Sequence, residues 1–200
     1  MDISNNQKIL ILSPHTDDAE LGCGGIMSRF SVEVMVFSGC GKSLPNGNKN
    51  VLYKECRQSL DTYGVDPIIH DFPVREFGLF RQHICDLLYT KRNQYDIVFC
   101  PSTADVHQDH QVITDEAKRV FKCSIFGYEL PWNTKEFRQD VFIQLTENHI
   151  QAKIKALEQY PSQQKRPYFD PEFIKALARL RGLQAGTTYA EAFEIIRWIV

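Results

Sequence analysis

The sequence predicts an α/β protein with a mostly parallel sheet and helices on both of its faces. Short apolar runs alternate along the chain with amphipathic stretches of helical periodicity. The runs are continuously apolar, as in strands that are buried on both faces, and do not alternate apolar with polar residues. With 200 residues, 43% of them hydrophobic and 24% charged, the chain can bury a core of its own. We therefore expect one three-layer domain over residues 1–200.

The expected elements follow from this alternation. Six apolar runs are the expected strands: Lys8–Ser13, Val32–Ser38, Pro67–Phe72, Asp96–Cys100, Ser124–Leu130 and Val141–Leu145. Seven amphipathic stretches are the expected helices: Ala19–Phe30, Val51–Tyr63, Phe77–Thr90, Asp109–Phe121, Glu147–Gln159, Pro171–Leu180 and Tyr189–Trp198. Right-handed crossovers allow the first and fourth strands to be neighbours, in the order 3-2-1-4. Ligands in such sheets bind beyond the carboxyl ends of the strands, so the loops after these two strands are the expected site.

Composition and charge exclude several classes of function. The net charge of -2, from 23 basic and 25 acidic residues, gives no long-range field for nucleic acid or for an acidic membrane. No apolar run approaches the roughly 18 residues of a membrane span. The first ten residues lack the basic start and long apolar core of a signal peptide, so we expect a cytoplasmic protein. The six cysteines form no C-x-x-C pair and are expected to be reduced thiols.

Both expected site loops contain the residue types that bind metal ions. The first strand leads directly into His15, Asp17 and Asp18, and the loop after the fourth strand contains His107–His110. Histidine nitrogen and aspartate oxygen bind zinc at about 2.0–2.2 Å. His15, Asp18 and His110 can therefore hold one ion from two facing loops. Three protein ligands with an open position are the pattern of a catalytic zinc site.

The remaining polar residues of the two loops fit catalytic roles. Asp17 is the expected general base for a metal-bound water. His107, as an imidazolium, can stabilise the oxyanion that develops on the substrate carbonyl. Asp109 is expected to orient a histidine ring and to keep His107 charged. A plainer reading of Asp17 and Asp18 is that they cap the following helix.

Three other features allow two readings each. The glycines within Leu21–Gly25 can pack a helix against the sheet, which we favour, or bring backbone N–H groups to a ligand. Trp132, which follows Glu129 at the end of the fifth strand, can stack on a sugar ring or simply pack. Arg181 can contribute to the rim of the site, although a helix C-terminal charge is the simpler interpretation.

These motifs resemble those of the PIG-L/LmbE-like N-deacetylases. His15–Asp18, Glu20 and Gly22–Gly25 resemble the PHPDD-E-GxGG signature, and His107–His110 resembles HPDH. The resemblance extends over nearly the whole chain, through these further segments: Tyr53–Val65, Glu129–Asn133, Ser162–Gln163 and Arg181–Phe193. It implies a Rossmann-like fold and a metal-dependent enzyme, mostly with zinc, that removes N-acetyl groups from glucosamine-containing compounds.

The resemblance also implies the residue roles given above. His15, Asp18 and His110 match the family's zinc ligands, and Asp17 and His107 match its base and its oxyanion-stabilising residue. Asp109 matches the carboxylate that tunes a neighbouring histidine. The sequence departs from the signatures at two positions, because Thr16 and Gln108 stand where the family has proline. Neither position is expected to touch the metal.

A further departure concerns substrate binding. The family often places an arginine that faces the substrate around Val51–Glu55, where this chain offers only Lys54 and, later, Arg57. The substrate-binding residues are therefore left unassigned.

The sequence thus predicts a zinc-dependent hydrolase that releases acetate from a small N-acetylated amino sugar. Ferrous iron is an alternative metal, because two histidines and an aspartate accept either ion. A second hypothesis is an amidase of the same metal core that acts on a non-sugar N-acyl compound or a thiol conjugate. A third is a Rossmann-like nucleotide-binding module without catalysis, although no phosphate-loop motif supports it. The family resemblance also allows a homo-oligomer.

Overall fold

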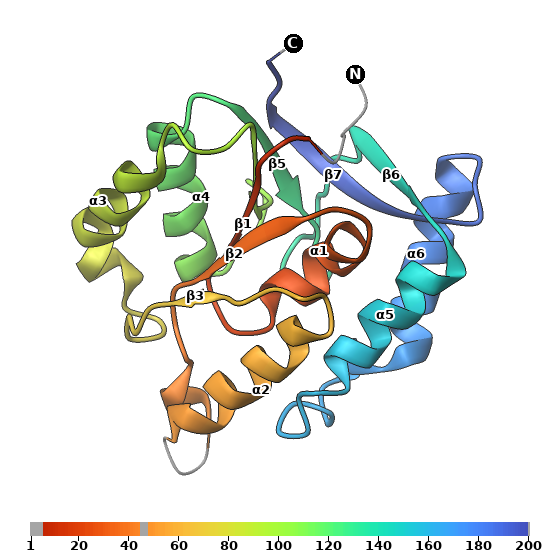
Figure 1. Cartoon of the computed structure of the whole chain (residues 1–200), viewed down its shortest axis with the longest axis horizontal. Helices are drawn as coiled ribbons and strands as arrows, with labels where there is room; N and C mark the ends of the chain where they lie inside the picture. Colours follow the sequence, from red (N-terminus) through yellow and green to blue (C-terminus); the bar gives the residue numbers. More distant parts are fainter. Residues whose placement is uncertain (1–5, 45–47, 200) are drawn as a thin grey trace.

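The computed structural model describes residues 6–44 and 48–199, with the side chains of Ser43 and Lys49 left aside. Residues 1–5, 45–47 and 200, which belong to the expected domain, lie outside the described part. Seven strands form one sheet in the order β3-β2-β1-β4-β5-β7-β6 (Figure 1). Their bounds are Ile9–Ser13 (β1), Val32–Val36 (β2), Ile68–Ile69 (β3), Ile97–Pro101 (β4), Ser124–Tyr128 (β5), Val141–Leu145 (β6) and Tyr189–Arg197 (β7). Strands β1 to β5 pair in parallel, so the predicted α/β class and the order 3-2-1-4 are confirmed.

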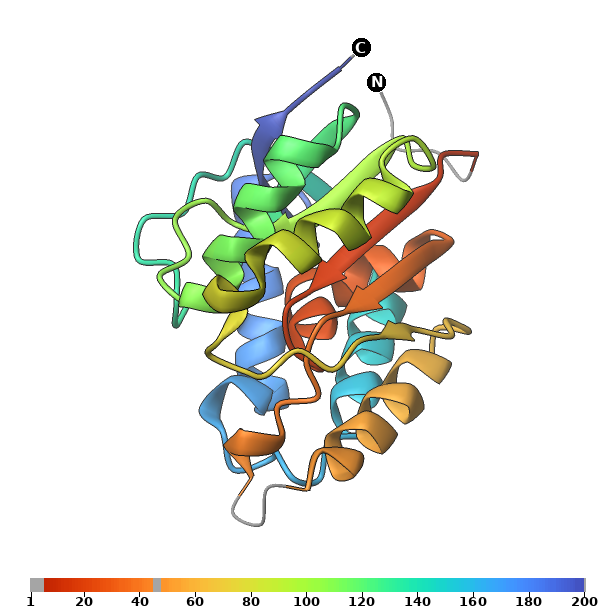
Figure 2. The same cartoon turned by 90° about the vertical axis from the view of Figure 1, so that its left-hand side faces the viewer.

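Helices cover both faces of the sheet (Figures 1 and 2). Their bounds are Asp18–Arg29 (α1), Lys49–Asp61 (α2), Arg81–Lys91 (α3), Gln108–Val120 (α4), Glu147–Leu157 (α5) and Pro171–Gln184 (α6). Three single-turn 3-10 helices are Gly41–Ser43 (η1), Phe77–Phe80 (η2) and Pro167–Phe169 (η3). Helices α3 and α4 lie on one face, and α1, α2, α5 and α6 lie on the other. Among the described residues, no helix is long and apolar enough to cross a membrane.

Two hydrophobic cores lie on either side of the sheet. Ile9 and Ile11 belong to the core under α1, α2 and α5, whereas Leu10 and Leu12 belong to the core under α3 and α4. Successive side chains of a strand point to opposite faces, so a continuously apolar strand fills both cores. All six cysteines are free, as expected.

The expectation for residues 189–198 is wrong, because they form strand β7 and not a helix. The segment is rich in alanine and glutamate, which favour helices. It instead inserts between β5 and β6 and pairs antiparallel with both, so the two neighbours satisfy its backbone hydrogen bonds. Its glutamates, which would form the solvent face of a helix, are buried and paired with polar groups. Glu194 accepts hydrogen bonds from Ser102 Oγ and from the backbone N–H of Thr103, both at 2.8 Å.

Helix α1 is kinked, and a buried ion pair satisfies the backbone groups that the kink frees. Cys23 departs from helical geometry, with φ -134° and ψ 18°. The N–H groups of Gly25 and Ile26 donate to the Glu191 carboxylate at 2.8 and 3.0 Å. Lys153 Nζ donates to the carbonyl of Leu21 and to Glu191, both at 2.7 Å. These charged groups replace the hydrogen bonds of the broken helical turn.

The glycines of this segment serve close packing, as we favoured. A Cβ on Gly22 would lie 2.4 Å from the Tyr128 ring, and a Cβ on Gly24 would lie 2.5 Å from the Lys153 side chain. Side chains occupy the space beside both glycines, so this part of α1 does not serve as a loop for phosphate.

The buried pair of Lys153 and Glu191 should be strongly coupled. Removing one partner leaves the other charge buried and unpaired, which typically costs about 3–5 kcal/mol. Urea unfolding of Lys153→Met, Glu191→Gln and the double variant should show large single effects and a double effect well below their sum. The exposed pair of Lys175 and Glu147 is the control, and its removal should change stability little, because solvent screens it. Additive effects at Lys153 and Glu191 would contradict this account.

Candidate metal and catalytic site

The candidate site lies where β1 and β4 end side by side. The two strands pair in parallel from Ile9 with Ile97 to Ile11 with Phe99, so their carboxyl-end loops meet at one edge of the sheet. A cavity of about 460 Å³ opens there, and residues of both loops line it. Its size is typical of small-molecule sites.

The three predicted metal ligands converge on one point. His15 Nδ1 lies 3.0 Å from Asp18 Oδ2 and 3.1 Å from His110 Nε2, and His110 Nε2 lies 3.2 Å from Asp18 Oδ2. Tetrahedral ligands at about 2.0–2.1 Å from a zinc ion would lie about 3.3–3.4 Å apart. The triangle therefore fits a zinc ion after the donors separate by a few tenths of an ångström.

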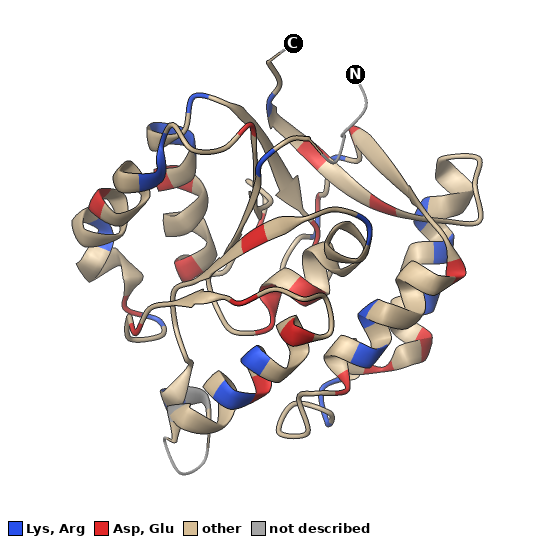
Figure 3. Cartoon of the chain, viewed as in Figure 1, with Lys and Arg blue, Asp and Glu red and all other residues tan. Residues whose placement is uncertain are grey.

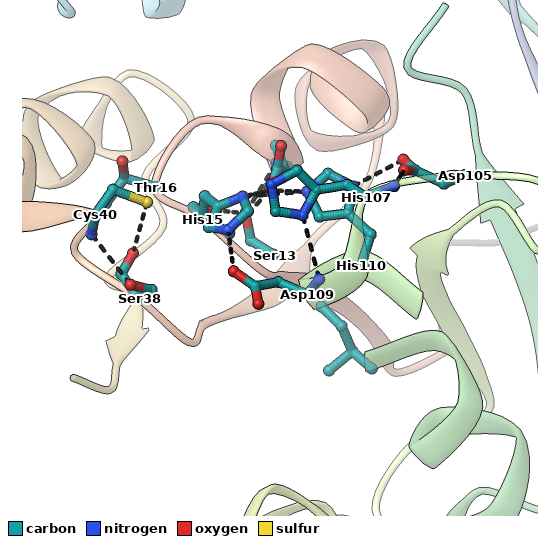
Figure 4. Close-up of polar contacts among 12 residues, drawn as sticks. Ser13, His15, Thr16, Ser38, Cys40, Asp105, His107, Asp109 and His110 are labelled. Atoms are coloured by element: carbon teal, nitrogen blue, oxygen red, sulfur yellow. Dashed lines mark hydrogen bonds and ion pairs between the residues drawn. The ribbon is translucent and has the colours of Figure 1, made fainter. Parts of the chain in front are cut away.

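Each histidine of this triangle contacts a carboxylate through the ring nitrogen that faces away from Asp18 (Figure 4). Asp109 Oδ2 lies 3.0 Å from His15 Nε2, and Asp105 Oδ2 lies 2.7 Å from His110 Nδ1. Each carboxylate accepts the ring N–H, so the other ring nitrogen is left to face Asp18, where it can carry a proton or bind an ion. Carboxylates in this position fix the tautomer and orientation of metal-binding histidines. The predicted partner role of Asp109 thus applies to His15, and Asp105 is a residue that sequence reasoning missed.

The charge balance of the triangle also favours a cation. Burial lowers the pKa of His110, but Asp18 and Asp105 outweigh it and raise this pKa to about 10. Burial raises the pKa of Asp18, yet His110 and His15 hold it well below its usual range. The buried carboxylate thus requires positive charge beside it, which a proton or a metal ion can supply.

His107 is a further nitrogen donor near the triangle. The ligand atoms of His15, His107 and His110 lie within 4.8 Å of one another. His107 caps α4, however, because its Nδ1 accepts the N–H of Asp109 at 3.2 Å, so only Nε2 is left for another partner. The separations of 3.0–3.2 Å favour Asp18 over His107 as the third ligand.

The protonation of His107 differs from the expectation. Burial lowers its pKa, and so do the charges of His110 and His15, whereas we expected an imidazolium. The carboxylate of Asp109, which was expected to keep His107 charged, is turned to His15. Because Nδ1 is an acceptor, the neutral ring carries its hydrogen on Nε2. His107 can therefore donate a hydrogen bond to a ligand as a neutral imidazole.

Asp17 has the surroundings of a general base. It precedes α1, but its side chain caps no backbone N–H, which speaks against the helix-capping interpretation. It is half-buried and lines the cavity. Burial raises the pKa of Asp17 to about 6, assisted by the negative charge of Asp18. A carboxylate near this pKa can accept and return a proton at neutral pH.

Glu20 and Tyr160 contact the loop that contains His15 and Asp18. Tyr160 Oη donates to the Thr16 carbonyl and lies 2.8 Å from Glu20 Oε1. The hydroxyl is within hydrogen-bonding distance of both oxygens. Burial raises the pKa of Glu20 to about 8, although hydrogen bonds from Ser59 and Tyr160 lower it, so Glu20 is mainly protonated at neutral pH.

The rim residues weighed in the sequence have partners of their own. Trp132 stacks on Tyr168, with ring centroids 4.0 Å apart, and both line the cavity. One face of the indole is therefore already covered. Arg181 forms a buried ion pair with Glu129, and its Nε lies 2.9 Å from Glu129 Oε2. This pair joins α6 to the residue that follows β5, and neither partner lines the cavity.

The cations of the cavity come from unexpected positions. Arg57 is exposed and pairs with Asp66 outside the cavity. The cavity lining instead includes Lys42, Arg75 and Arg166. In Figure 3, Lys and Arg are spread over the helices and loops, with Asp and Glu among them.

Comparisons with known proteins agree with the motifs. No protein-family model matches the chain. The uncharacterized deacetylase YaiS of Escherichia coli (strain K12) is 28% identical over 177 residues, which cover 80% of this chain and 94% of that protein.

Solved structures share the fold at lower identity. N,N'-diacetylchitobiose deacetylase of Pyrococcus horikoshii superposes with a TM-score of 0.78 at 21% identity, covering 98% of this chain and 87% of that one. The 4-carboxy-2-hydroxymuconate hydratase of Pseudomonas putida superposes with a TM-score of 0.76 at 18% identity, covering 96% and 98%. The fold therefore supports more than one kind of reaction.

The two motifs, the similarity to YaiS and the shared fold all agree with the resemblance to the LmbE-like/PIG-L deacetylases.

The protonated Glu20 generates a prediction on stability. The pKa of Glu20 rises from 4.5 to about 8 on folding, so its contribution is complete below pH 4.5 and is lost as the pH rises towards 8. The stability of the native chain relative to Glu20→Gln should therefore fall between pH 5 and pH 8, measured by urea unfolding at matched metal content. Glu158→Gln, at an exposed position, should show no such change. A constant difference between native and Glu20→Gln would show that Glu20 is ionised.

Proposed function

We propose that this chain is a metal-dependent deacetylase that hydrolyses the acetyl amide of an N-acetylated amino sugar. The observation that carries the proposal is the triangle of His15, Asp18 and His110 with Asp17 beside it at the cavity wall. Zinc is the metal we propose, and ferrous iron is the alternative for the same ligands. In such a site zinc supplies Lewis acidity, which polarises a carbonyl and lowers the pKa of a coordinated water to about 7.

Asp17 and His107, beside the triangle, would carry out proton transfer and stabilisation of the oxyanion. Asp17 accepts the proton of the attacking water, for which its pKa near 6 is suited. His107 donates its Nε2 hydrogen to the oxygen that gains negative charge in the tetrahedral intermediate. The protonated Asp17 then returns the proton to the departing amine. The products are acetate and the protonated amine, because the second proton of the water leaves the acetic acid and ends on the amine.

The positioning residues act through the histidines. Asp109 and Asp105 keep His15 and His110 in the tautomers that present a lone pair to the ion. The same Asp109 supplies the backbone N–H that orients His107. The first turn of α4 therefore sets the metal ligand and the oxyanion donor together.

Two variants separate metal binding from proton transfer. His110→Ala should lose the metal and the activity together, because it removes one of three ligands. Asp17→Asn should retain the metal and lose about 10²–10⁴-fold in rate, as is typical for a general base. Metal content and acetate release from a panel of N-acetylated sugars and N-acyl amino acids would be measured. Asp61→Asn, on the exposed end of α2, is the control.

Two outcomes of that experiment would change the account. Metal loss in Asp17→Asn would make Asp17 a ligand. Turnover confined to the N-acyl amino acids would favour the amidase hypothesis over a sugar substrate.

The pH profile tests the roles of Asp17 and His107. Asp17 must be ionised, so kcat/KM should fall as the pH drops through its pKa, at or below about 6, because a bound cation lowers the value further. His107→Gln should reduce kcat/KM by about 10²-fold or more, as for loss of an oxyanion donor. It should leave the acidic limb of the profile in place, since a neutral His107 has no proton to lose in this range. An alkaline limb in the native profile that disappears in His107→Gln would show that the imidazolium is the active form.

A further inference from the structure

Two residues of the cavity wall have a strained backbone. Cys40 and Arg75, with φ of 50° and 69°, are the non-glycine residues with positive φ in the described part of the chain. Both line the cavity. Such conformations are unfavourable for residues with a Cβ and persist where the surroundings fix them. The strained backbone of Arg75 raises the question of which contacts hold this residue in its conformation.

The backbone of Arg75 is fixed by the same helical turn that positions the metal site. Its N–H donates to Asp109 Oδ2 at 2.6 Å, and Gln108 Nε2 donates to its carbonyl. Asp109 in turn holds His15. Val74 before it and Phe77 after it are buried, so the chain is anchored on both sides. The position of Arg75 relative to the metal ligands is therefore determined by direct contacts.

The Arg75 guanidinium has no partner within the described residues. The side chain is exposed at the cavity and forms neither a hydrogen bond nor an ion pair there. The side chain of Arg75 is exposed, so the strained backbone does not serve to bury it. The fixed backbone instead places the permanently charged guanidinium group at the cavity.

A second arginine reaches the same cavity from another part of the chain. Arg166 lies between α5 and η3, and its guanidinium donates to the neutral hydroxyl of Tyr168. No carboxylate among the described residues forms an ion pair with it. Lys42, the third cation of the lining, is already paired with Glu76. Arg75 and Arg166 are therefore the two cations of the lining that have no ion-pair partner among the described residues.

The carboxylates of the lining form no hydrogen bond or ion pair with these arginines. Asp17 and Asp18 line the cavity, and the negative charge of Asp17 acts on Arg166 over a longer distance. The proposed function uses Asp18 for the ion and Asp17 for the proton. A substrate made only of hydroxyl and acetamide groups would therefore leave both guanidinium groups without an ion-pair partner.

We propose that Arg75 and Arg166 bind an anionic group carried by the N-acetylated substrate. This inference rests on the proposed function and specifies its substrate class, an N-acetyl compound with a carboxylate or a phosphate. Arginine suits either anion, because its planar fork can donate two parallel hydrogen bonds to a pair of oxygens. The anion would lie at the cavity mouth while the acetyl group reaches the metal.

The test compares three probes on zinc-loaded Asp17→Asn protein, which binds without turnover. N-acetylglucosamine 1-phosphate carries a phosphate, N-acetylmuramic acid carries a carboxylate, and methyl N-acetylglucosaminide is neutral. Titration calorimetry should give at least one anionic probe an affinity about tenfold or more above that of the neutral one. The anionic probe that binds more tightly identifies the charged group. Added salt should weaken its binding and leave the neutral probe unaffected.

Substitutions assign the effect to the arginines. In the same background, Arg75→Gln and Arg166→Gln should each reduce the preference for the anionic probe by about tenfold, and Arg75→Lys should restore part of it. Arg57→Gln is the matched control, an exposed arginine outside the cavity, and should leave the preference unchanged. Circular dichroism and metal content would verify that each variant is folded and loaded.

The outcomes distinguish this inference from the proposed function. Equal affinity for all three probes overturns it, and so does an anion preference that survives both arginine substitutions, since the metal alone would then hold the anion. In either case, acetate release by the native enzyme would leave the deacetylase proposal standing. Arginine-dependent anion binding without acetate release from any probe would instead support the anion site and contradict the deacetylase.

Discussion

The parallel pairing of β1 with β4 is the constraint on which the site depends. It brings two loops, about ninety residues apart in sequence, to one edge of the sheet. Each loop alone supplies an incomplete set of ligands, with His15 and Asp18 from one and His110 from the other. His110 Nε2 comes within 3.1 Å of His15 Nδ1 and 3.2 Å of Asp18 Oδ2 because the strands are adjacent. The chemistry of the cavity therefore follows from the topology of the sheet.

Strand β7 supports both halves of this arrangement from behind. Glu194 binds Ser102 and Thr103 at the end of β4, and Glu191 binds the kinked turn of α1 that follows the first metal loop. The two glutamates lie on one strand, so both halves of the site are fixed to the same part of the sheet. Buried charges of this kind are stable only when fully paired. Correct placement of β7 is thus a condition for placing the ligands.

Local patterns in the sequence were sufficient for most of the architecture and for locating the two loops that meet at the cavity. The strands β1, β2, β4, β5 and β6 are mostly apolar runs, and the proposed ligands lie in two motifs that follow β1 and β4. The same patterns failed at residues 189–198, where pairing with β5 and β6 overrides a composition that favours a helix. Asp105 and the cations Arg75 and Arg166 were also missed. Their roles depend on contacts across the cavity, which no spacing along the chain encodes.

The central claim is that His15, Asp18 and His110 form one metal site with a position open to substrate. A crystal structure of the zinc-loaded protein, with an anomalous difference map at the zinc edge, tests it most directly. The account predicts one peak at about 2.0–2.2 Å from His15 Nδ1, His110 Nε2 and an Asp18 oxygen, with solvent as the fourth ligand. A peak bound by His107 in place of Asp18, or no peak between the two loops, would contradict it.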